Sequence, residues 1–260
     1  MTCHAFACGG LTPLLASEFS LQRPRQVAAD QSSDRSPHSK EWRLDLPKAL
    51  LTVMIQEDNE QTRIKAAEII ASGGVIAFRT DTFYGLGADP FNSNAVARIR
   101  ELKGREDDKP ILLLISDADE VDRFIEQSGF FKMVAVGHWP APLTLVGVAR
   151  PEVPIELTAG THSLGVRLPD DEEVRTLVRV CGGALTATSA NLSGQPPART
   201  AQEVQNYFPQ GIDLIIDGAE VTAREPSTVL DLSGSEVRLV REGAVTREEL
   251  GEFFEQSHDA

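Results

Sequence analysis

The stretch that decides the fold is residues 73–110, GGVIAFRTDTFYGLGADPFNSNAVARIRELKGREDDKP. Two glycines lead into a short apolar run, 75–78, which is typical of a buried strand. A polar turn and a second pair of glycines follow, and glycine lets a backbone bend or approach a ligand closely. The apolar spacing over 94–103 predicts a helix, which ends in Lys103-Gly104-Arg105. A strand, a hydroxyl-rich turn, glycines, a helix and two cations together indicate an anion site.

Strands and helices alternate on both sides of this stretch. A helix is expected over 59–71, and Asp or Thr followed three positions later by Glu predicts helix starts at Asp117, Asp170, Thr200 and Thr246. Short apolar runs predict further strands at 111–115, 143–148, 164–168, 184–187, 214–216, 228–232 and 237–240. The alternation predicts a single α/β domain with a twisted mixed sheet, flanking helices and a concave ligand cleft.

Composition limits the function classes. Hydrophobic residues make up 41% of the 260 and charged residues 25%, so a packed globular core is expected. The net charge of −14 disfavours broad binding to nucleic acid or anionic membranes, although it is compatible with a local basic cleft. Three cysteines give no disulfide framework and no zinc spacing, which fits a reducing cytoplasm. No apolar run reaches the roughly 18 residues that span a bilayer.

Residues 1–53 differ from the rest, because they mix Ser, Pro, Arg, Asp and Gln with little periodicity. This composition favours a disordered extension, or a translation start that truly lies at Met54. A targeting role is the weaker alternative, since no basic start precedes a long apolar core. The folded domain is expected over 57–255.

Four polar clusters fall at expected strand or helix ends, where ligands collect in open α/β sheets. Arginine offers a planar fork to phosphate or carboxylate, and lysine offers a point charge. Each cluster also has a plain structural interpretation, as a solvated helix end, a turn, or a loop that bonds its own backbone. His138 and His162 lack a partner at ligand spacing, so no metal site is predicted. The clusters are Thr80-Asp81-Thr82, Lys103-x-Arg105, Ser189-x-Asn191, and Ser227-Thr228 with Arg241.

Several ordered motifs carry a resemblance to a known family. They are TDTFYGLGADP, KGR…KP, WPAPLTLV, LGVRLP, TSANLSG, PSTVLD and VREG, and they extend over about residues 60–250. With these motifs the chain resembles the YrdC-like family, the threonylcarbamoyl-AMP synthases, in its short single-domain form. It departs from the family pattern at Arg79, Ala141 and Leu114.

The resemblance implies a nucleotidyltransferase that joins L-threonine, bicarbonate and ATP into L-threonylcarbamoyladenylate and releases pyrophosphate. By position, L-threonine would be bound by Thr80, Arg167, Ala187 and Ser227. The expected ATP-binding residues are Lys103, Arg105, Asp107, Ser163, Ser189, Asn191, Pro197 and Arg241. Of these, Lys103 and Arg105 are the expected catalytic pair, because cations offset the repulsion among anionic reactants.

Cofactors and partners follow from the same resemblance. Mg²⁺ is expected to bind mainly through the ATP phosphates. A downstream transferase complex would deliver the threonylcarbamoyl group to the adenosine beside the anticodon of tRNA, and weak direct binding of tRNA is a further expectation. The alternatives are an RNA-binding YrdC-like paralogue without synthase activity, and a carbamoyl-adenylate domain of the hydrogenase-maturation type.

Overall fold

The computed structural model describes residues 53–104 and 109–256. The expectations for residues 1–52, and for Arg105 and Asp107, lie outside the described residues. Within the described ranges, every helix is too short or too polar to cross a membrane.

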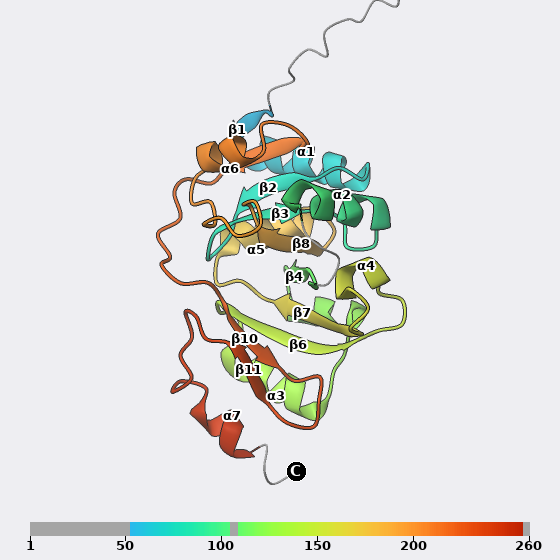
Figure 1. The fold of residues 1–260 in the computed structure, drawn as a ribbon, viewed down its shortest axis with the longest axis vertical. Helices are drawn as coiled ribbons and strands as arrows, with labels where there is room; N and C mark the ends of the chain where they lie inside the picture. Colours follow the sequence, from blue (N-terminus) through green and yellow to red (C-terminus); the bar gives the residue numbers. More distant parts are fainter. Residues whose placement is uncertain (1–52, 105–108, 257–260) are drawn as a thin grey trace, which may run out of the picture. The chain divides into compact units, whose positions relative to one another are not determined.

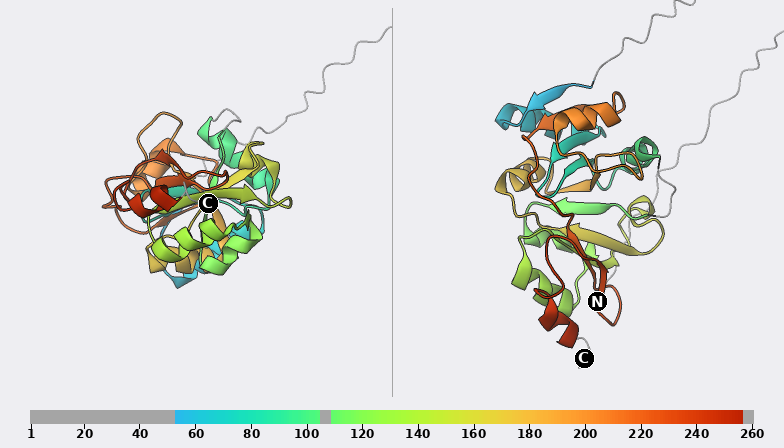
Figure 2. Two further views of the ribbon diagram at one scale, coloured as in Figure 1. Left: turned by 90° about the horizontal axis from the view of Figure 1, so that it is seen from below. Right: turned by 60° about the vertical axis from the view of Figure 1, so that its left-hand side comes forward.

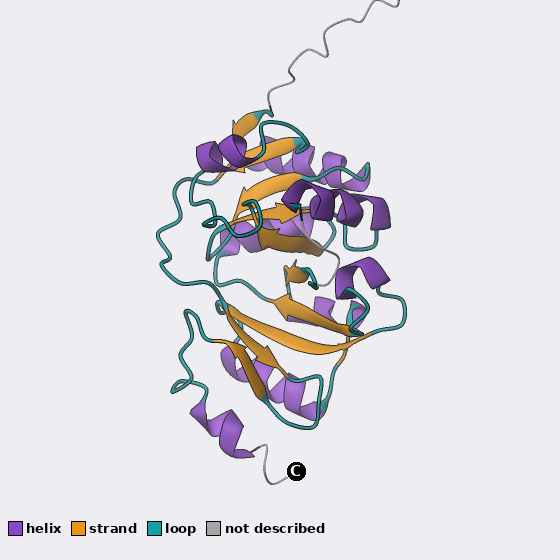
Figure 3. Ribbon diagram, viewed as in Figure 1, coloured by secondary structure: helices purple, strands orange, loops and turns teal. Residues whose placement is uncertain are grey.

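An 11-stranded mixed sheet organises the domain. Figures 1 and 3 show how its strands are arranged among the helices. Its order is β1-β9-β2-β3-β8-β4-β7-β6-β10-β11, and β5 pairs with β6 off this path. The pairs β1/β9, β9/β2, β4/β7 and β6/β10 are parallel, and the others are antiparallel. The strands are β1 Ile55–Glu57, β2 Ile76–Arg79, β3 Tyr84–Gly87, β4 Leu112–Ile115, β5 Ile125–Glu126, β6 Leu143–Ala149, β7 Ser163–Arg167, β8 Ala184–Ser189, β9 Leu214–Asp217, β10 Thr228–Asp231 and β11 Arg238–Arg241.

Helices cover both faces of the sheet. The helices are α1 Glu60–Ala71, α2 Ser93–Lys103, α3 Gly129–His138, α4 Ile155–Thr158, α5 Glu172–Val180, α6 Ala201–Tyr207 and α7 Gly251–Gln256, with a 3₁₀ helix, η1, at Ala118–Arg123. In the right-hand view of Figure 2, α1 and α5 lie on one side of the strands, and α2 and α4 lie on the other.

Alternation along the strands explains this two-sided cover. In β2, Ile76 and Phe78 join the apolar cluster beneath α1 and α5, whereas Ala77 joins the cluster that includes residues of α2, α4 and α6. Because successive side chains of a strand point to opposite faces, an unbroken apolar run needs cover on both. The predicted α/β class with a mixed sheet is therefore confirmed.

The helix starts were predicted with mixed success. Asp171, not Asp170, caps α5, because it is the Asp171 carboxylate that reaches the amides of Glu173 and Val174. The prediction that Asp117 caps an α-helix was wrong. A 3₁₀ helix follows it without a side-chain cap, because the Asp117 carboxylate bonds Arg179 and Ser116 instead.

The caps at Thr200 and Thr246 form as predicted. The Thr200 side chain accepts a hydrogen bond from the Glu203 amide. Thr246 and Glu249 bond each other reciprocally, although regular helix geometry in α7 begins only at Gly251.

Two differences concern the chain near the site. Tyr84–Gly87 is a fully buried strand, β3, where the paired glycines suggested a bend. Val53, assigned from the sequence to the irregular extension, is 5% exposed within the core, and its carbonyl accepts a hydrogen bond from Gln205 Nε2 at 2.8 Å. A truncation that preserves the core therefore has to retain Val53.

Candidate active site

A hollow of about 580 Å³ lies where the β2–β3 turn meets the ends of β7, β8 and β11 and the start of β10. Its walls include eight of the residues predicted for the site: Thr80, Arg167, Ala187, Ser189, Asn191, Pro197, Ser227 and Arg241. These residues come from distant parts of the sequence, so the fold brings the expected amino-acid group and half of the expected nucleotide group to one place.

The turn between β2 and β3 is built around the Thr80 hydroxyl. Thr80 Oγ1 donates to the Phe83 carbonyl at 2.6 Å and accepts from the amides of Thr82 and Phe83, each at 3.2 Å. Thr80 is 3% exposed. A hydroxyl with three backbone partners fixes the turn, so the neighbouring Asp81 and Thr82 side chains are held in defined positions.

A buried ion pair lies beside the hollow, and of its two members only Arg167 lines the hollow. Arg167, the last residue of β7, places Nη2 2.9 Å from Asp81 Oδ1, and the two side chains are only 4% and 6% exposed. Arg167 Nη2 also lies 3.4 Å from Thr82 Oγ1. Arg167 Nε is buried and has no hydrogen-bond acceptor among the described residues. The guanidinium therefore has one buried donor that is not satisfied by the described residues.

The electrostatics of this pair follow from its burial. Burial lowers the pKa of Arg167, and the negative charge of Asp81 partly offsets that shift. Burial raises the pKa of Asp81, and the Arg167 charge opposes the rise. Each group thus carries a desolvation cost that the opposite charge offsets in part, and backbone hydrogen bonds also lower the pKa of Asp81.

Arg241 and Ser227 form another part of the wall of the hollow. Arg241 donates from Nε and Nη2 to the Ser227 carbonyl at 3.1 and 2.8 Å, and from Nη2 to Ser227 Oγ at 3.1 Å. Ser227 Oγ lies 3.0 Å from Thr144 Oγ1 of β6. Burial lowers the pKa of Arg241, and the positive charge of Arg167 lowers it further. Two guanidinium groups line the hollow, and only one of them is paired with a carboxylate among the described residues, so the hollow is suited to an anion.

Lys103, at the end of α2, is held differently. Its Nζ donates to the carbonyls of Ser189 and Asn191, the latter at 3.0 Å, and lies 3.4 Å from Asn191 Oδ1. Lys103 is 3% exposed and does not itself line the hollow. The lysine thus organises the strand end that carries Ser189 and Asn191, at the point where the chain enters residues 105–108.

One described residue, Ser163, stands apart from this assembly, and two further predicted residues are not described. Ser163 begins β7, whereas Arg167 ends it, so Ser163 lies roughly 13 Å away along the strand and does not line the hollow. Its contact with ATP stays a prediction. Arg105 and Asp107 lie outside the described residues, and their roles stay predictions as well.

Several site residues escaped the sequence-based analysis. Asp81 and Thr82 belong to a cluster that was recognised, but neither was assigned a role. Thr144 sits inside an apolar strand motif and carries no signal of its own. Gln195 and Pro226 also line the hollow. The useful signal was the TDT turn, because an aspartate between two threonines needs a partner when the turn is buried.

The fold and the hollow define an α/β domain that gathers cations at its strand ends. A family model described as "Telomere recombination", for Sua5, YciO and YrdC, matches residues 68–243. The chain belongs to this Sua5/YciO/YrdC family, and the resemblance carried by the motifs is confirmed. A threonylcarbamoyl-AMP synthase of Idiomarina loihiensis is 36% identical over 176 residues, which are 66% of this chain and 95% of that protein.

Solved structures agree with this assignment. The crystal structure of Pyrococcus abyssi Sua5 complexed with L-threonine is similar, with a TM-score of 0.72 and 35% identity, over 77% of this chain and 59% of that chain. This chain thus spans somewhat more than half the length of the archaeal protein. The structure of Escherichia coli YciO gives a TM-score of 0.68 at 25% identity, over 76% of this chain and 97% of that one.

Proposed function

We propose that this chain is an L-threonylcarbamoyladenylate synthase that uses L-threonine, bicarbonate and ATP. The observation that carries the proposal is the hollow itself, because the four residues expected for threonine and four of the eight expected for ATP line it together. The names of similar proteins support the same activity and not the RNA-binding alternative.

We assign the amino-acid side of the hollow to the Asp81–Arg167 ion pair and to Ser227 and Arg241. A threonine carboxylate would accept from the open Arg167 Nε, a buried donor that otherwise lacks a partner. Arg241 would add a second positive charge at the same end of the hollow. Thr80 and Ala187 would line the remainder of the amino-acid subsite.

The nucleotide side is assigned to Ser189, Asn191, Pro197 and Arg241, with Lys103 and Arg105 as the cations nearest the phosphates. Ser163 and Asp107 are further predicted contacts. In residues 53–104 and 109–256, no group of three or more His, Cys, Asp or Glu side chains could hold a metal ion. We therefore assign the oxygen ligands of Mg²⁺ mainly to the ATP phosphates, where the ion would neutralise charge on the leaving pyrophosphate.

The reaction joins three anions, so alignment and charge compensation are the main tasks. The threonine amine takes up the carbon of bicarbonate to form a carbamate, with loss of water. A carbamate oxygen then bonds to the α-phosphorus of ATP as the bond to pyrophosphate breaks. The cations offset the repulsion, and holding the reactants in line can be worth about 7–11 kcal/mol.

Downstream partners complete the proposal. The adenylate would pass to a transferase complex that modifies the adenosine beside the anticodon of tRNA. Weak tRNA binding by this chain and a cytoplasmic location are further proposals, motivated by the family and by the reducing environment that the cysteine pattern suggests.

A product assay tests the function. The full-length chain is incubated with ATP, Mg²⁺, bicarbonate and L-threonine, and the mixture is analysed by chromatography and mass spectrometry. We expect threonylcarbamoyladenylate and pyrophosphate in equal amounts, with loss of both when threonine, bicarbonate or Mg²⁺ is omitted. Folded protein that yields no product, beside an active control synthase, would refute the proposal. Salt-dependent tRNA binding without ATP would then favour the RNA-binding alternative.

A further inference from the structure

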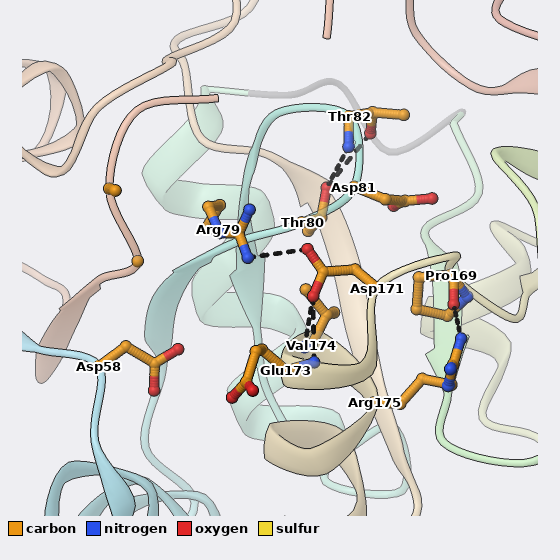
Figure 4. A network of polar contacts seen from close by, with 12 residues as sticks. Asp58, Arg79, Thr80, Asp81, Thr82, Pro169, Asp171, Glu173, Val174 and Arg175 are labelled. Carbon is orange, nitrogen blue, oxygen red and sulfur yellow. Dashed lines mark hydrogen bonds and ion pairs between the residues drawn. The ribbon is translucent and has the colours of Figure 1, made fainter. Parts of the chain in front are cut away.

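A network of polar contacts joins the end of β2 to the start of α5, just outside the hollow. Figure 4 shows Arg79 and Asp171 pointing toward one another below the Thr80–Thr82 turn. Arg79 Nη2 lies 2.8 Å from Asp171 Oδ2. The other oxygen, Oδ1, accepts from the amides of Glu173 and Val174 at 3.0 and 3.2 Å. One carboxylate thus caps a helix and pairs with Arg79 at the same time.

The β2–β3 turn and the β7–α5 connection are joined by a second ion pair, which lies beside the hollow. Asp81 follows Arg79 closely and pairs with Arg167, which in turn shortly precedes Asp171. In the sheet, β3, β8 and β4 separate β2 from β7. Sheet hydrogen bonds therefore do not connect the two segments directly, and the two ion pairs bridge them side by side, one buried and one partly exposed.

Charge and packing make the inner pair sensitive to the outer one. Burial is the main cause that raises the pKa of Asp81, and the negative charge of Asp171 adds a smaller rise, so a cation on Asp171 favours the ionised form of Asp81. The Arg79 side chain is also confined, because a methyl group added at Gly218 would lie 3.0 Å from its Cβ and Nε. A confined side chain loses little conformational freedom when it makes the ion pair.

We propose that Arg79 is a positioning residue for the amino-acid side of the hollow. It holds the β7–α5 connection against the β2–β3 turn, which keeps Arg167 aligned with Asp81 at the edge of the hollow. The nucleotide side does not share this support, because Lys103, Ser189 and Asn191 are tied to one another. The inference rests on the proposed function, since it names a residue that acts on threonine binding.

The test separates the two substrates. Arg79→Met retains the aliphatic stem and removes the charge. We expect KM and Kd for L-threonine to rise about tenfold, since small misplacements of binding groups are costly, while KM for ATP stays within about twofold. Asp171→Asn should give the same split, because asparagine caps a helix as well as aspartate does but does not carry the charge. Arg79→Lys should restore part of the threonine affinity.

Glu173→Gln is the matched control. It removes the Arg63–Glu173 ion pair from the same first turn of α5 without altering Asp171. We expect it to leave both substrate constants unchanged. Calorimetric titration of the unaltered full-length chain with L-threonine tests the proposed function separately from the role of Arg79. No binding there would overturn the proposed function and the inference with it. Binding that Arg79→Met leaves within twofold, or equal losses for both substrates, would overturn the inference alone.

Discussion

The two cations at the heart of the site are held in opposite ways. Arg167 faces a carboxylate, Asp81, in a pocket from which water is nearly excluded. Among the described residues, Lys103 donates to backbone carbonyls at the end of β8, and these neutral dipoles help to stabilise its ammonium group. A buried charge paired with a charge depends on its partner far more than a charge solvated by dipoles does. The amino-acid side should therefore tolerate substitution less well than the nucleotide side.

The largest effect is expected from Arg167→Met. It leaves Asp81 buried without a counter-charge, which costs about 3–5 kcal/mol of stability, and it removes the main donor to the threonine carboxylate. Urea unfolding measures the first effect, and threonine titration measures the second. The double variant Asp81→Asn with Arg167→Met should regain much of the stability but not the binding. If the single variant is as stable as the unaltered chain, the comparison fails.

Lys103→Met should cost less. The carbonyls of Ser189 and Asn191 lose a donor, which is worth about 1–3 kcal/mol for buried acceptors. Unfolding curves give the stability, and the KM for ATP should rise because the strand end that carries Ser189 and Asn191 loosens. Arg98→Met is the control on the same helix, since Arg98 pairs with Asp213 at a site 37% exposed and should contribute about 0–1 kcal/mol. A loss larger than that of Arg167→Met would reverse the comparison.

Arg241→Lys tests the residue that we assign to both the amino-acid side and the nucleotide side of the hollow. Lysine cannot reproduce the two bonds that Arg241 makes through Nε and Nη2 to the Ser227 carbonyl. Losing one such charged bond is worth about 1.5 kcal/mol, or roughly tenfold in affinity. Steady-state kinetics should show the rise in KM for both substrates, because Arg241 faces both. An increase confined to one substrate would assign Arg241 to that side alone.

Ser189→Ala should have the smallest structural effect. The backbone carbonyl of Ser189 accepts a hydrogen bond from Lys103 Nζ. The Ser189 hydroxyl lies 3.5 Å from the same Nζ, which is the outer limit of hydrogen bonding. Alanine keeps the carbonyl, so stability should change by less than about 0.5 kcal/mol. A rise in KM for ATP alone, measured against the same variant's melting temperature, would assign the hydroxyl to the nucleotide. A large loss of stability would mean that the side chain, and not the backbone, holds this region.

Local signals predicted the framework of the fold because they act within a few residues. Apolar runs found most of the strands, and side-chain caps located most helix starts. The strand β3 was missed because its glycines resemble a bend. They serve packing instead, since a methyl group at Gly87 would lie 2.7 Å from Phe78 Cε1.

The site was only partly predictable for a different reason. Thr82 and Arg167 are 85 positions apart, and no periodicity links such distant residues. The bonds of Lys103 go to backbone carbonyls, which every residue possesses, so they leave no trace in the sequence. The family motifs supplied these long-range groupings, and the structure then added Asp81 as the charge partner and Arg79 beside it.

The strand order also governs when the molecule can be completed during its synthesis. Strand β9 lies between β1 and β2, although the ribosome makes it long after both. Until then, β2 presents an unpaired edge, which is a hazard for aggregation in a growing chain. The walls of the hollow close only when Ser227 and Arg241 have emerged. A nascent chain that binds threonine is therefore one whose sheet is already whole.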